Sequence, residues 1–577
     1  MGVLPGMTPS RHTRDHRRAP ADPTDAMDPT DATLKPCQAL AWMILILLAY
    51  TWAVPFRDIY GLEARIALMA REMMENGLAL FPRAMGRPYP DYPPLYFWLE
   101  VLFSRLIGHV NTLSVVLPSA LSATLLVALT FILGREINRR TGWLAALILA
   151  TSPDFWQKAG SAAIDMLLAL TITAALACLY FRARDNRRQI RSLYSAGVLI
   201  FPALAFLTKG PIGIVLPAAA WGAFLLWEKR TGDLFRFALF ISVFGAMCVA
   251  GEMAVAWETG GMDFVHDVMK MQVLGRVGQK AGKPFYYYLA CLPAAAGPWF
   301  LWSIPQAGRF FARVFKSPGV ATLRASMPSH PVMRLSTTWF LSVLIIFSLA
   351  GSKHARYILP LFPALAVILA AGVTRAMGRE IPARHRVLEP LLMVIIGGLL
   401  VSGVIFTAFF RPYQASPVEI ACTVLWLCAV CSGWLAIRNR TAGKFRVVAL
   451  TALMLATGLS AFDFFARPIV SKRASGRAFV KTSESQVGPD VPVAIFGLGR
   501  DRDGVKYALY SHRRGKDIRF ISRIENIKEL PVPCLLITYE KHLSRIRAVA
   551  GLKNLRVLTR GAIRSRKTVS CLIAGQG

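Results

Sequence analysis

Long apolar segments separated by short polar, mostly basic loops dominate this sequence. Runs such as 39–54, 113–133 and 387–410 are almost free of charged side chains, and each approaches the roughly 20 residues with which an α-helix crosses a bilayer. The pattern predicts a polytopic α-helical membrane protein with about thirteen transmembrane helices. The predicted spans are 38–55, 113–134, 141–156, 163–181, 193–207, 211–227, 234–257, 286–306, 335–350, 357–376, 387–410, 418–437 and 445–465.

Basic residues predict the orientation of these spans. Lys and Arg cluster after every second span, and such clusters mark cytoplasmic loops. The odd number of spans then places the C-terminal part outside the cytoplasm, opposite a cytoplasmic N-terminus. The basic segments are 135–140, 182–191, 229–236, 309–334, 375–386 and 438–446.

For this alternation to hold, one apolar run must not be counted as a membrane span. Residues 95–108 are too short to span, and they include Glu100 and Arg105, so we expect an interfacial or re-entrant segment. The first external loop then covers about 56–111. Loops of that length are usually functional.

Composition agrees with a membrane protein and narrows its partners. The chain is 54% hydrophobic and 17% charged, against roughly 25% charged residues in soluble domains, which excludes a soluble multi-domain enzyme. The net charge of +34 predicts positive-inside loops and contact with anionic lipid. No basic stripe with interleaved aromatic residues occurs, so we expect no nucleic-acid partner.

Three regions are predicted along the chain. Residues 1–36 indicate a disordered cytoplasmic leader, residues 37–470 the transmembrane domain, and residues 471–577 a small α/β extracytoplasmic domain. In the last region Gly497-Leu498-Gly499 favours a plain turn over a phosphate loop. A disulfide between Cys534 and Cys571 stays open, because it requires an oxidising compartment.

Ionisable residues gather on the predicted outer face. Several lie in or beside apolar runs, where a charge is costly unless it is paired. This clustering predicts a site at the outer membrane boundary that combines carboxylates with cations suited to phosphate. The residues are Asp58, Glu63, Arg65, Arg87, Asp91, Asp165, Lys209, Asp263, His266, Arg276, Lys353, His354 and Arg356.

The first loop and two basic turns carry the main candidates. Helical spacing from Glu63 through Met69 and Met73 predicts an amphipathic helix lying on the membrane, and a merely solvated surface helix is the alternative. Lys209 lies in one external turn, and Lys353 with Arg356 lies in another. These cations are either interfacial anchors or phosphate ligands. Two outward-facing basic turns, against the positive-inside bias, favour phosphate.

The motifs together resemble a known superfamily. They are Glu63-x-Arg65, Tyr89-Pro90-Asp91-x-Pro93-Pro94-Leu95-Tyr96-x-Trp98, Asp165, Leu207-Thr208-Lys209-Gly210-Pro211 and Gly351-Ser352-Lys353 followed by Arg356-Tyr357-Ile358-Leu359-Pro360. In this order they look like the aminoarabinose (lipid A) transferase and dolichyl-phosphate-mannose–protein mannosyltransferase superfamily. The resemblance covers roughly residues 38–380 and implies a GT-C-type membrane glycosyltransferase.

The resemblance implies roles for individual residues. The candidate catalytic carboxylates are Glu63, Asp91 and Asp165. The candidate substrate- and phosphate-binding residues are Arg65, Lys209, Arg276, Lys353, Arg356 and Tyr357. On this basis, Asp165→Asn and Lys353→Ala are each expected to abolish transfer.

Two positions depart from the family pattern. Leu62 stands where the family usually has Asp, and Tyr92 stands where it usually has Lys. The identity of the base therefore stays open: Glu63 or Asp58 could take this role, or Asp91 and Asp165 could share it. A divalent metal bridging Asp91 and His266 is a further alternative, although a structural histidine is favoured over it.

We therefore expect a glycosyltransferase of the bacterial inner membrane. It would move a sugar from a polyprenyl (undecaprenyl) phosphate donor to an extracytoplasmic acceptor such as lipid A, glycan or protein. One rival is a transporter or flippase for lipid-linked or anionic cargo, but we find no inverted repeats or mid-membrane broken helices of the kind transporters use. The other is a non-catalytic homologue, which Leu62 keeps open.

Overall fold

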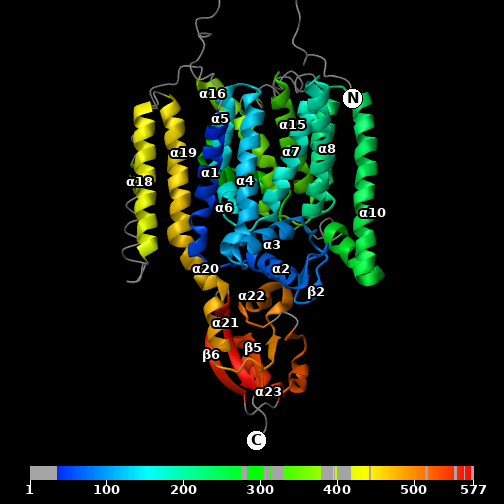
Figure 1. Ribbon diagram of the computed structural model, residues 1–577, viewed down its shortest axis with the longest axis vertical. Coiled ribbons are helices and arrows are strands. Elements are labelled where there is room, and N and C mark those ends of the chain that lie inside the picture. The colour runs from blue at the N-terminus through cyan, green and yellow to red at the C-terminus, as the bar shows by residue number, and fades with distance from the viewer. Residues whose placement is uncertain are drawn as a thin grey trace, which may run out of the picture.

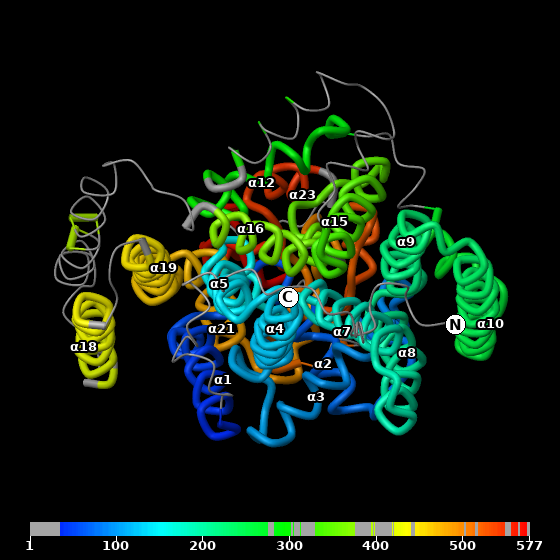
Figure 2. The backbone as a smooth tube through the Cα atoms, turned by 90° about the horizontal axis from the view of Figure 1, so that it is seen from above, coloured from blue at the N-terminus to red at the C-terminus, as the bar shows by residue number. Residues whose placement is uncertain are grey.

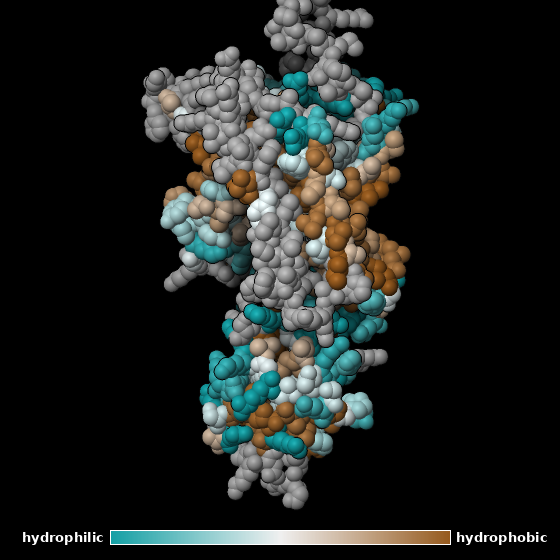
Figure 3. Space-filling model, turned by 90° about the vertical axis from the view of Figure 1, so that its left-hand side faces the viewer, coloured by the Kyte–Doolittle hydropathy of each residue, from teal (hydrophilic) through white to brown (hydrophobic). Residues whose placement is uncertain are grey.

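The computed structural model describes residues 35–274, 282–304, 329–377, 417–440, 444–513, 517–550, 555–563 and 566–573, together with six single positions at 308, 312, 394, 395, 397 and 398. Over these residues the chain forms a helical bundle with a sheet-containing part at one end (Figure 1). Nine of the described helical segments are long and apolar enough to cross a membrane. The prediction of a multi-pass helical membrane protein is confirmed. Figure 3 shows apolar side chains on the flank of the bundle and polar ones at its far end and over the sheet-containing part.

The helices of the bundle follow the apolar runs of the sequence. Seen from above, α4 lies among α1, α5 and α7, while α10 and α18 stand at opposite edges (Figure 2). The bundle helices are α1 (Pro36–Thr51), α4 (Thr112–Arg135), α5 (Arg139–Ala150), α6 (Pro153–Ala159), α7 (Ile164–Arg184), α8 (Arg188–Lys209), α9 (Ile212–Trp227), α10 (Thr231–Met269), α12 (Tyr287–Ala296), α15 (Pro331–Leu349), α16 (Phe362–Met377), α18 (Pro417–Arg440) and α19 (Lys444–Ala461).

Short 3-10 and π segments join or extend these helices. Those of the bundle are η2 (Val54–Phe56), η3 (Lys270–Leu274), η4 (Gly297–Ser303), η5 (Ala355–Leu361) and η6 (Phe462–Ala466).

Three predicted spans form shorter helices than expected. The span 141–156 divides into α5 and α6, because Pro153 occupies the first turn of α6 and lacks the N–H that would continue α5. The span 211–227 forms α9, a 16-residue helix. The span 286–306 forms α12 followed by η4. The span 387–410 lies almost wholly outside the described residues, so the count of thirteen stays a prediction.

Local sequence explains how the central helices begin and pack. Asn111 caps α4, since its side chain accepts a hydrogen bond from Ser114 N at 2.8 Å, satisfying a backbone donor that the helix leaves unpaired. Gly134 in α4 and Gly142 in α5 face each other so closely that a Cβ on Gly134 would lie 2.9 Å from the Gly142 Cα. Only glycine fits at both positions, as is common where membrane helices pack closely.

Two helices of the first loop lie at the end of the bundle, next to the sheet-containing part (Figure 1). They are α2 (Glu63–Asn76) and α3 (Leu95–Ile107), and the short hairpin β1 (Arg83–Ala84) and β2 (Arg87–Pro88) joins them. At 13 residues, α3 is too short to cross the membrane, as expected for residues 95–108. Met69 and Met73 on α2 are buried in a core shared with the C-terminal part. The expectation that α2 lies on the membrane is therefore wrong: its apolar face is covered by protein rather than by lipid.

The C-terminal part contains a five-stranded mixed sheet in the order β4-β3-β5-β7-β6. Strand β3 pairs in parallel with β4 and β5, while β7 pairs antiparallel with β5 and β6. Val493 is opposite Ile518 and Leu535 in this register. The strands are β3 (Val493–Phe496), β4 (Ile518–Ile521), β5 (Cys534–Tyr539), β6 (Leu555–Ile563) and β7 (Arg566–Ile573).

Helices surround this sheet and connect it to the bundle. They are α20 (Arg467–Ser475), α21 (Arg477–Glu484), α22 (Gly504–Tyr510) and α23 (Leu543–Ala550), with the short turns η7 (Gly499–Asp503), η9 (Ile524–Glu529) and η10 (Glu540–His542). Cys534 and Cys571 are buried free thiols on the neighbouring strands β5 and β7. Burial raises the pKa of each thiol to about 11.

Polar contacts fix the sheet-containing part against α2. Arg71 donates to the Ala508 carbonyl at 2.8 Å and to the Leu509 carbonyl at 2.9 Å, at the C-terminal end of α22. Tyr510 donates to the Ile59 carbonyl at 2.7 Å. A cation at a helix C-terminus is favourable because the last carbonyls lack partners. These bonds hold the first loop between the bundle and the sheet.

Candidate functional site

A cavity of about 260 Å³ lies where the first loop meets the bundle. Its walls come from segments far apart in the chain: the start of α2, the loop before α3, α6 with the start of α7, the end of α8, η5 and α20. All six of these walls carry charged side chains. The charged lining residues are Glu63, Arg65, Asp91, Lys158, Asp165, Lys209, Arg356 and Arg467.

Asp165 pairs with two cations on one wall of the cavity. Its Oδ1 accepts from Lys209 Nζ, and its Oδ2 lies 3.3 Å from Arg356 Nε. Asp165 stands in the first turn of α7 and Lys209 in the last turn of α8, where the helix dipoles favour these charges. The α7–α8 packing therefore brings together two groups that are 44 residues apart.

Tyr357 completes this wall. Lys209 Nζ lies 4.2 Å from the centre of the Tyr357 ring, and the Arg356 guanidinium lies 5.5 Å from it. Cations over an aromatic face are held by its quadrupole. The arrangement presents two fixed positive groups, and such groups suit a phosphate.

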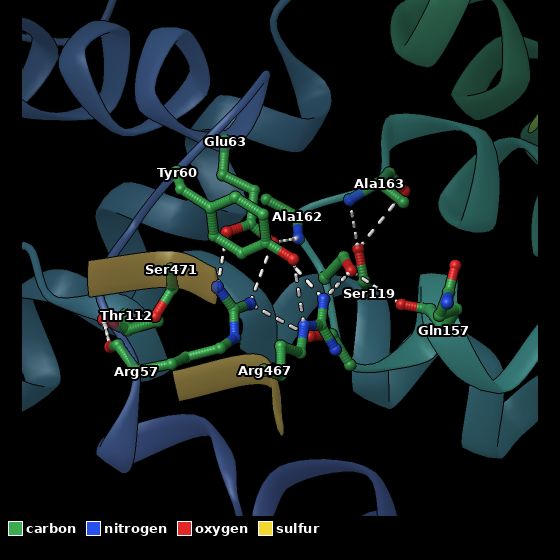
Figure 4. A network of polar contacts seen from close by, with 12 residues as sticks. Arg57, Tyr60, Glu63, Thr112, Ser119, Gln157, Ala162, Ala163, Arg467 and Ser471 are labelled. Carbon is green, nitrogen blue, oxygen red and sulfur yellow. Dashed lines mark hydrogen bonds and ion pairs between the residues drawn. The ribbon is translucent and has the colours of Figure 1, made fainter. Parts of the chain in front are cut away.

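Glu63 also lines the cavity, within a second ion-pair network (Figure 4). Arg57 donates to both of its carboxylate oxygens, at 2.6 and 2.8 Å. Ala162 N donates at 3.1 Å, and Arg467 Nη2 lies 4.0 Å from Glu63 Oε1. Glu63 is thus held from three directions.

The electrostatics of Glu63 follow from these partners. Burial by itself would raise the pKa of its carboxyl, but the charge and hydrogen bonds of Arg57, the charge of Arg467 and the Ala162 N–H lower it below the ordinary value. A carboxylate with a lowered pKa is a weaker base. In this geometry Glu63 holds the side chains of Arg57 and Arg467 in place.

The loop before α3 forms a third wall. Arg65 donates to the Tyr89 hydroxyl at 2.7 Å, and the Tyr89 ring stacks on Tyr92 with centroids 6.0 Å apart. Burial first, and then the charge of Asp91, raise the pKa of the Tyr92 phenol. Tyr92 therefore stays neutral in the cavity. Leu62, at the other departure from the family pattern, also lines the cavity and is 52% exposed.

Of the predicted site residues that the structure describes, all but Lys353 meet at this cavity. Glu63, Asp91, Asp165, Arg65, Lys209, Arg356 and Tyr357 all line it. Lys353 is buried, donates to the Ala350 carbonyl at 2.6 Å and is not among the described lining residues. Arg276 lies outside the described residues.

The donors around the cavity do not fit a divalent metal. Among the described residues there is no group of three or more His, Cys, Asp or Glu side chains arranged to hold a metal ion. Glu63 and Asp165 are already neutralised by cations. His266 is exposed and is not one of the described lining residues.

Sequence reasoning missed three polar residues of the site. Arg467 lines the cavity from α20 and bonds to Asp463 at 3.0 Å and to the Tyr60 hydroxyl at 3.3 Å. Lys158 and Ser161 contribute from α6 and the turn after it. The available signal for Arg467 was a basic residue directly after an apolar span, on the same predicted face as Glu63.

The fold and this cavity define a polytopic membrane protein with a polar site at one end of its bundle. Comparisons with known proteins agree. A family model described as dolichyl-phosphate-mannose-protein mannosyltransferase matches residues 91–254. The fold is similar to the crystal structure of ArnT from Cupriavidus metallidurans bound to undecaprenyl phosphate, with a TM-score of 0.68, 19% identity, and coverage of 94% of this chain and 100% of that one.

Two curated relatives carry the same kind of name, undecaprenyl phosphate-alpha-4-amino-4-deoxy-L-arabinose arabinosyl transferase. The Shewanella sediminis (strain HAW-EB3) protein is 26% identical over 58% of this chain and 59% of its own length. The protein from Pectobacterium carotovorum subsp. carotovorum (strain PC1) is 28% identical over 67% of this chain and 69% of its own length. The chain thus spans about 59% to 69% of these relatives. Together these findings show that the chain is similar in sequence to these membrane glycosyltransferases and similar in fold to ArnT.

Proposed function

We propose that this chain transfers a sugar from a polyprenyl phosphate, such as undecaprenyl phosphate, to an acceptor outside the cytoplasm. The observation that carries the proposal is the pair of cations, Lys209 and Arg356, that Asp165 fixes over Tyr357 on the cavity wall. The names of the relatives, and the ligand of the similar structure, support the donor class.

The reaction requires charge stabilisation at the leaving group. An acceptor oxygen forms a bond to the anomeric carbon of the sugar while the bond from that carbon to the phosphate oxygen breaks. The electron pair of the broken bond leaves with polyprenyl phosphate, whose negative charge increases. Lys209 and Arg356 are placed to stabilise that charge, and preorganised groups of this kind are usually the largest contribution to catalysis.

An acceptor hydroxyl also loses a proton. We assign its removal to Asp91, because Arg57 and Arg467 engage Glu63, and Lys209 and Arg356 engage Asp165. Arg65 and Tyr92 line the cavity together with Asp91, and we assign to them the orientation of the sugar. Glu63 then acts as a positioning residue.

We also propose an orientation in the membrane. The helices α2 and α20, which contribute residues to the cavity, lie at the end of the bundle that carries the sheet-containing part (Figure 1). At the other end of the bundle, Arg184 at the end of α7 pairs with Glu136 directly after α4, and Arg334 near the start of α15 pairs with Glu228 directly after α9. These helix ends flank the basic segments 135–140, 182–191 and 229–236. Positive-inside bias places such basic loops in the cytoplasm, and hence the cavity at the outer face of a bacterial inner membrane. The acceptors we consider are lipid A, a glycan or a protein.

Lipid mass spectrometry on cells with and without the gene tests the transferase. We expect a polyprenyl-phosphate sugar to accumulate on deletion, and a mass the size of that sugar to disappear from an acceptor. The Lys209→Ala gene should fail to restore both pools, while the wild-type gene restores them. Unchanged donor and acceptor pools in expressing cells would contradict the proposal and favour a transporter or a non-catalytic homologue.

A further inference from the structure

The charge of the cavity limits the charge that the donor sugar can carry. Three carboxylates and five cations line it, which gives a formal excess of two positive charges. The carboxylates are Glu63, Asp91 and Asp165, and the cations are Arg65, Lys158, Lys209, Arg356 and Arg467.

Two of the three carboxylates, Glu63 and Asp165, are paired with cations of the protein. Glu63 receives Arg57 through both oxygens and has Arg467 at 4.0 Å. Asp165 divides its two oxygens between Lys209 and Arg356. Neither can receive a cationic ligand without giving up a buried ion pair, which would leave an uncompensated charge of the protein behind.

The excess positive charge matches the phosphate instead. A sugar–phosphate–lipid diester carries one negative charge, and the phosphate monoester that leaves carries about 1.5 to 2, as other phosphate monoesters do near pH 7. The two excess cations therefore balance the leaving phosphate and no more. A positively charged sugar would restore an excess of positive charge in a small cavity, where like charges repel strongly.

We propose that the donor sugar of this chain carries no positive charge, and that it is a neutral pentose or hexose. This inference rests on the proposed function and differs from the 4-amino-4-deoxy-L-arabinose in the names of the relatives. For the charge of the sugar the most important residue is Leu62. It lines the cavity at the start of α2 with an apolar side chain, which carries no charge.

Competition binding with the purified full-length chain in lipid nanodiscs tests the inference. The probe is radiolabelled undecaprenyl phosphate. The competitors are undecaprenyl-phosphate arabinose and the same compound with a 4-amino group in place of the 4-hydroxyl. We expect the hydroxyl compound to bind at least tenfold more tightly at pH 7.

The outcomes separate the two proposals. Equal or tighter binding of the amino compound would overturn the inference while leaving the proposed donor class in place. Failure of the undecaprenyl-phosphate probe itself to bind saturably would contradict the proposed function, and the inference with it.

A gain-of-binding variant tests the electrostatic reason. Leu62→Asp adds a carboxylate to the cavity, and Leu62→Asn adds the same shape without the charge. We expect Leu62→Asp to shift the ratio of binding in favour of the amino compound over the hydroxyl compound about tenfold relative to Leu62→Asn. The same preference in both variants would overturn the inference, because the charge of the cavity would then not select the sugar.

Discussion

Arg356 lies with its Nε 3.3 Å from Oδ2 of Asp165, at the wall of the cavity. The two residues come from η5 and α7, and they meet only because these elements pack against each other. Asp165 also pairs with Lys209, so one carboxylate sets the position of both cations that we assign to the phosphate.

Replacing Asp165 tests whether this carboxylate organises the site. In Asp165→Asn we expect transfer to fall by two orders of magnitude or more, because Lys209 and Arg356 lose their common partner. Breaking a buried ion pair also costs about 3–5 kcal/mol, so the melting temperature should fall. The measurement is the initial rate of transfer by protein in nanodiscs, together with thermal unfolding.

Asp154 supplies a matched control. It is an acid in α6 that does not line the cavity. Asp154→Asn should keep the transfer rate within about threefold of wild type. Equal losses in the two variants would mean that Asp165 has no special role.

Two lysines that the sequence could not distinguish should behave differently. Lys209 lines the cavity, whereas Lys353 donates to the Ala350 carbonyl. We expect Lys209→Ala to raise the KM for the donor at least tenfold and to lower kcat. Lys353→Ala should mainly lower thermal stability, contrary to the expectation from motifs alone. Steady-state kinetics on both variants decide the matter, and a larger loss of kcat in Lys353→Ala would refute this assignment.

Glu63 should make stability depend on acid pH. Its folded-state pKa is below the ordinary value of 4.5, so its stabilising contribution is present above about pH 4.5 and is lost as the pH falls through the folded pKa. Glu63→Gln lacks this contribution at neutral pH. We expect its melting temperature to lie below that of wild type at pH 7 and to approach it on acidification. Parallel curves for the two proteins would contradict the network drawn in Figure 4.

Glu100 should make stability depend on pH in the direction opposite to that of Glu63. It is fully buried in α3, neither carboxylate oxygen has a hydrogen-bond partner, and burial followed by the charge of Glu63 raises its pKa well above the ordinary value. Its protonated form is favoured in the folded state, so stability is highest below the ordinary pKa and falls as the pH rises through the raised one.

The apolar variant Glu100→Met removes this penalty. A buried polar group without partners costs about 1–3 kcal/mol. We therefore expect Glu100→Met to melt at a higher temperature than wild type, with the difference growing from pH 5 to pH 9. The readout is thermal unfolding across that range. A variant that is less stable at every pH would show that Glu100 has a stabilising role.

The sequence predicted the positions of the helices well, but it did not predict which side chains contact each other. Apolar runs such as 113–134 and 163–181 became α4 and α7 because membrane helices satisfy their backbone groups within one segment. The turns carrying Lys209 and Arg356 were found for the same reason: they end apolar runs. The hydrophobic spacing of α2, by contrast, does not distinguish a surface covered by lipid from one covered by protein, and Met69 is buried in a core that includes residues of the sheet-containing part.

The pairings within the site depend on packing between distant segments. Arg467 and Glu63 are 404 positions apart in the numbering, and nothing in either local sequence indicates that they meet. The same is true of Lys353, whose motif places it beside Arg356 although its side chain turns to the backbone. Composition and motifs predicted which residue types gather at the outer face, and the packing of α7, α8, η5 and α20 determined which of them touch.

The most direct test of the account is the release of undecaprenyl phosphate from a synthetic undecaprenyl-phosphate sugar by the purified chain, with membrane extract as the source of acceptor. The account predicts release that depends on the extract, together with appearance of the sugar on an acceptor, and loss of both in Lys209→Ala and Asp165→Asn. Release that is equal in wild type and in these two variants, or no release by folded wild-type protein that binds the donor, would contradict it.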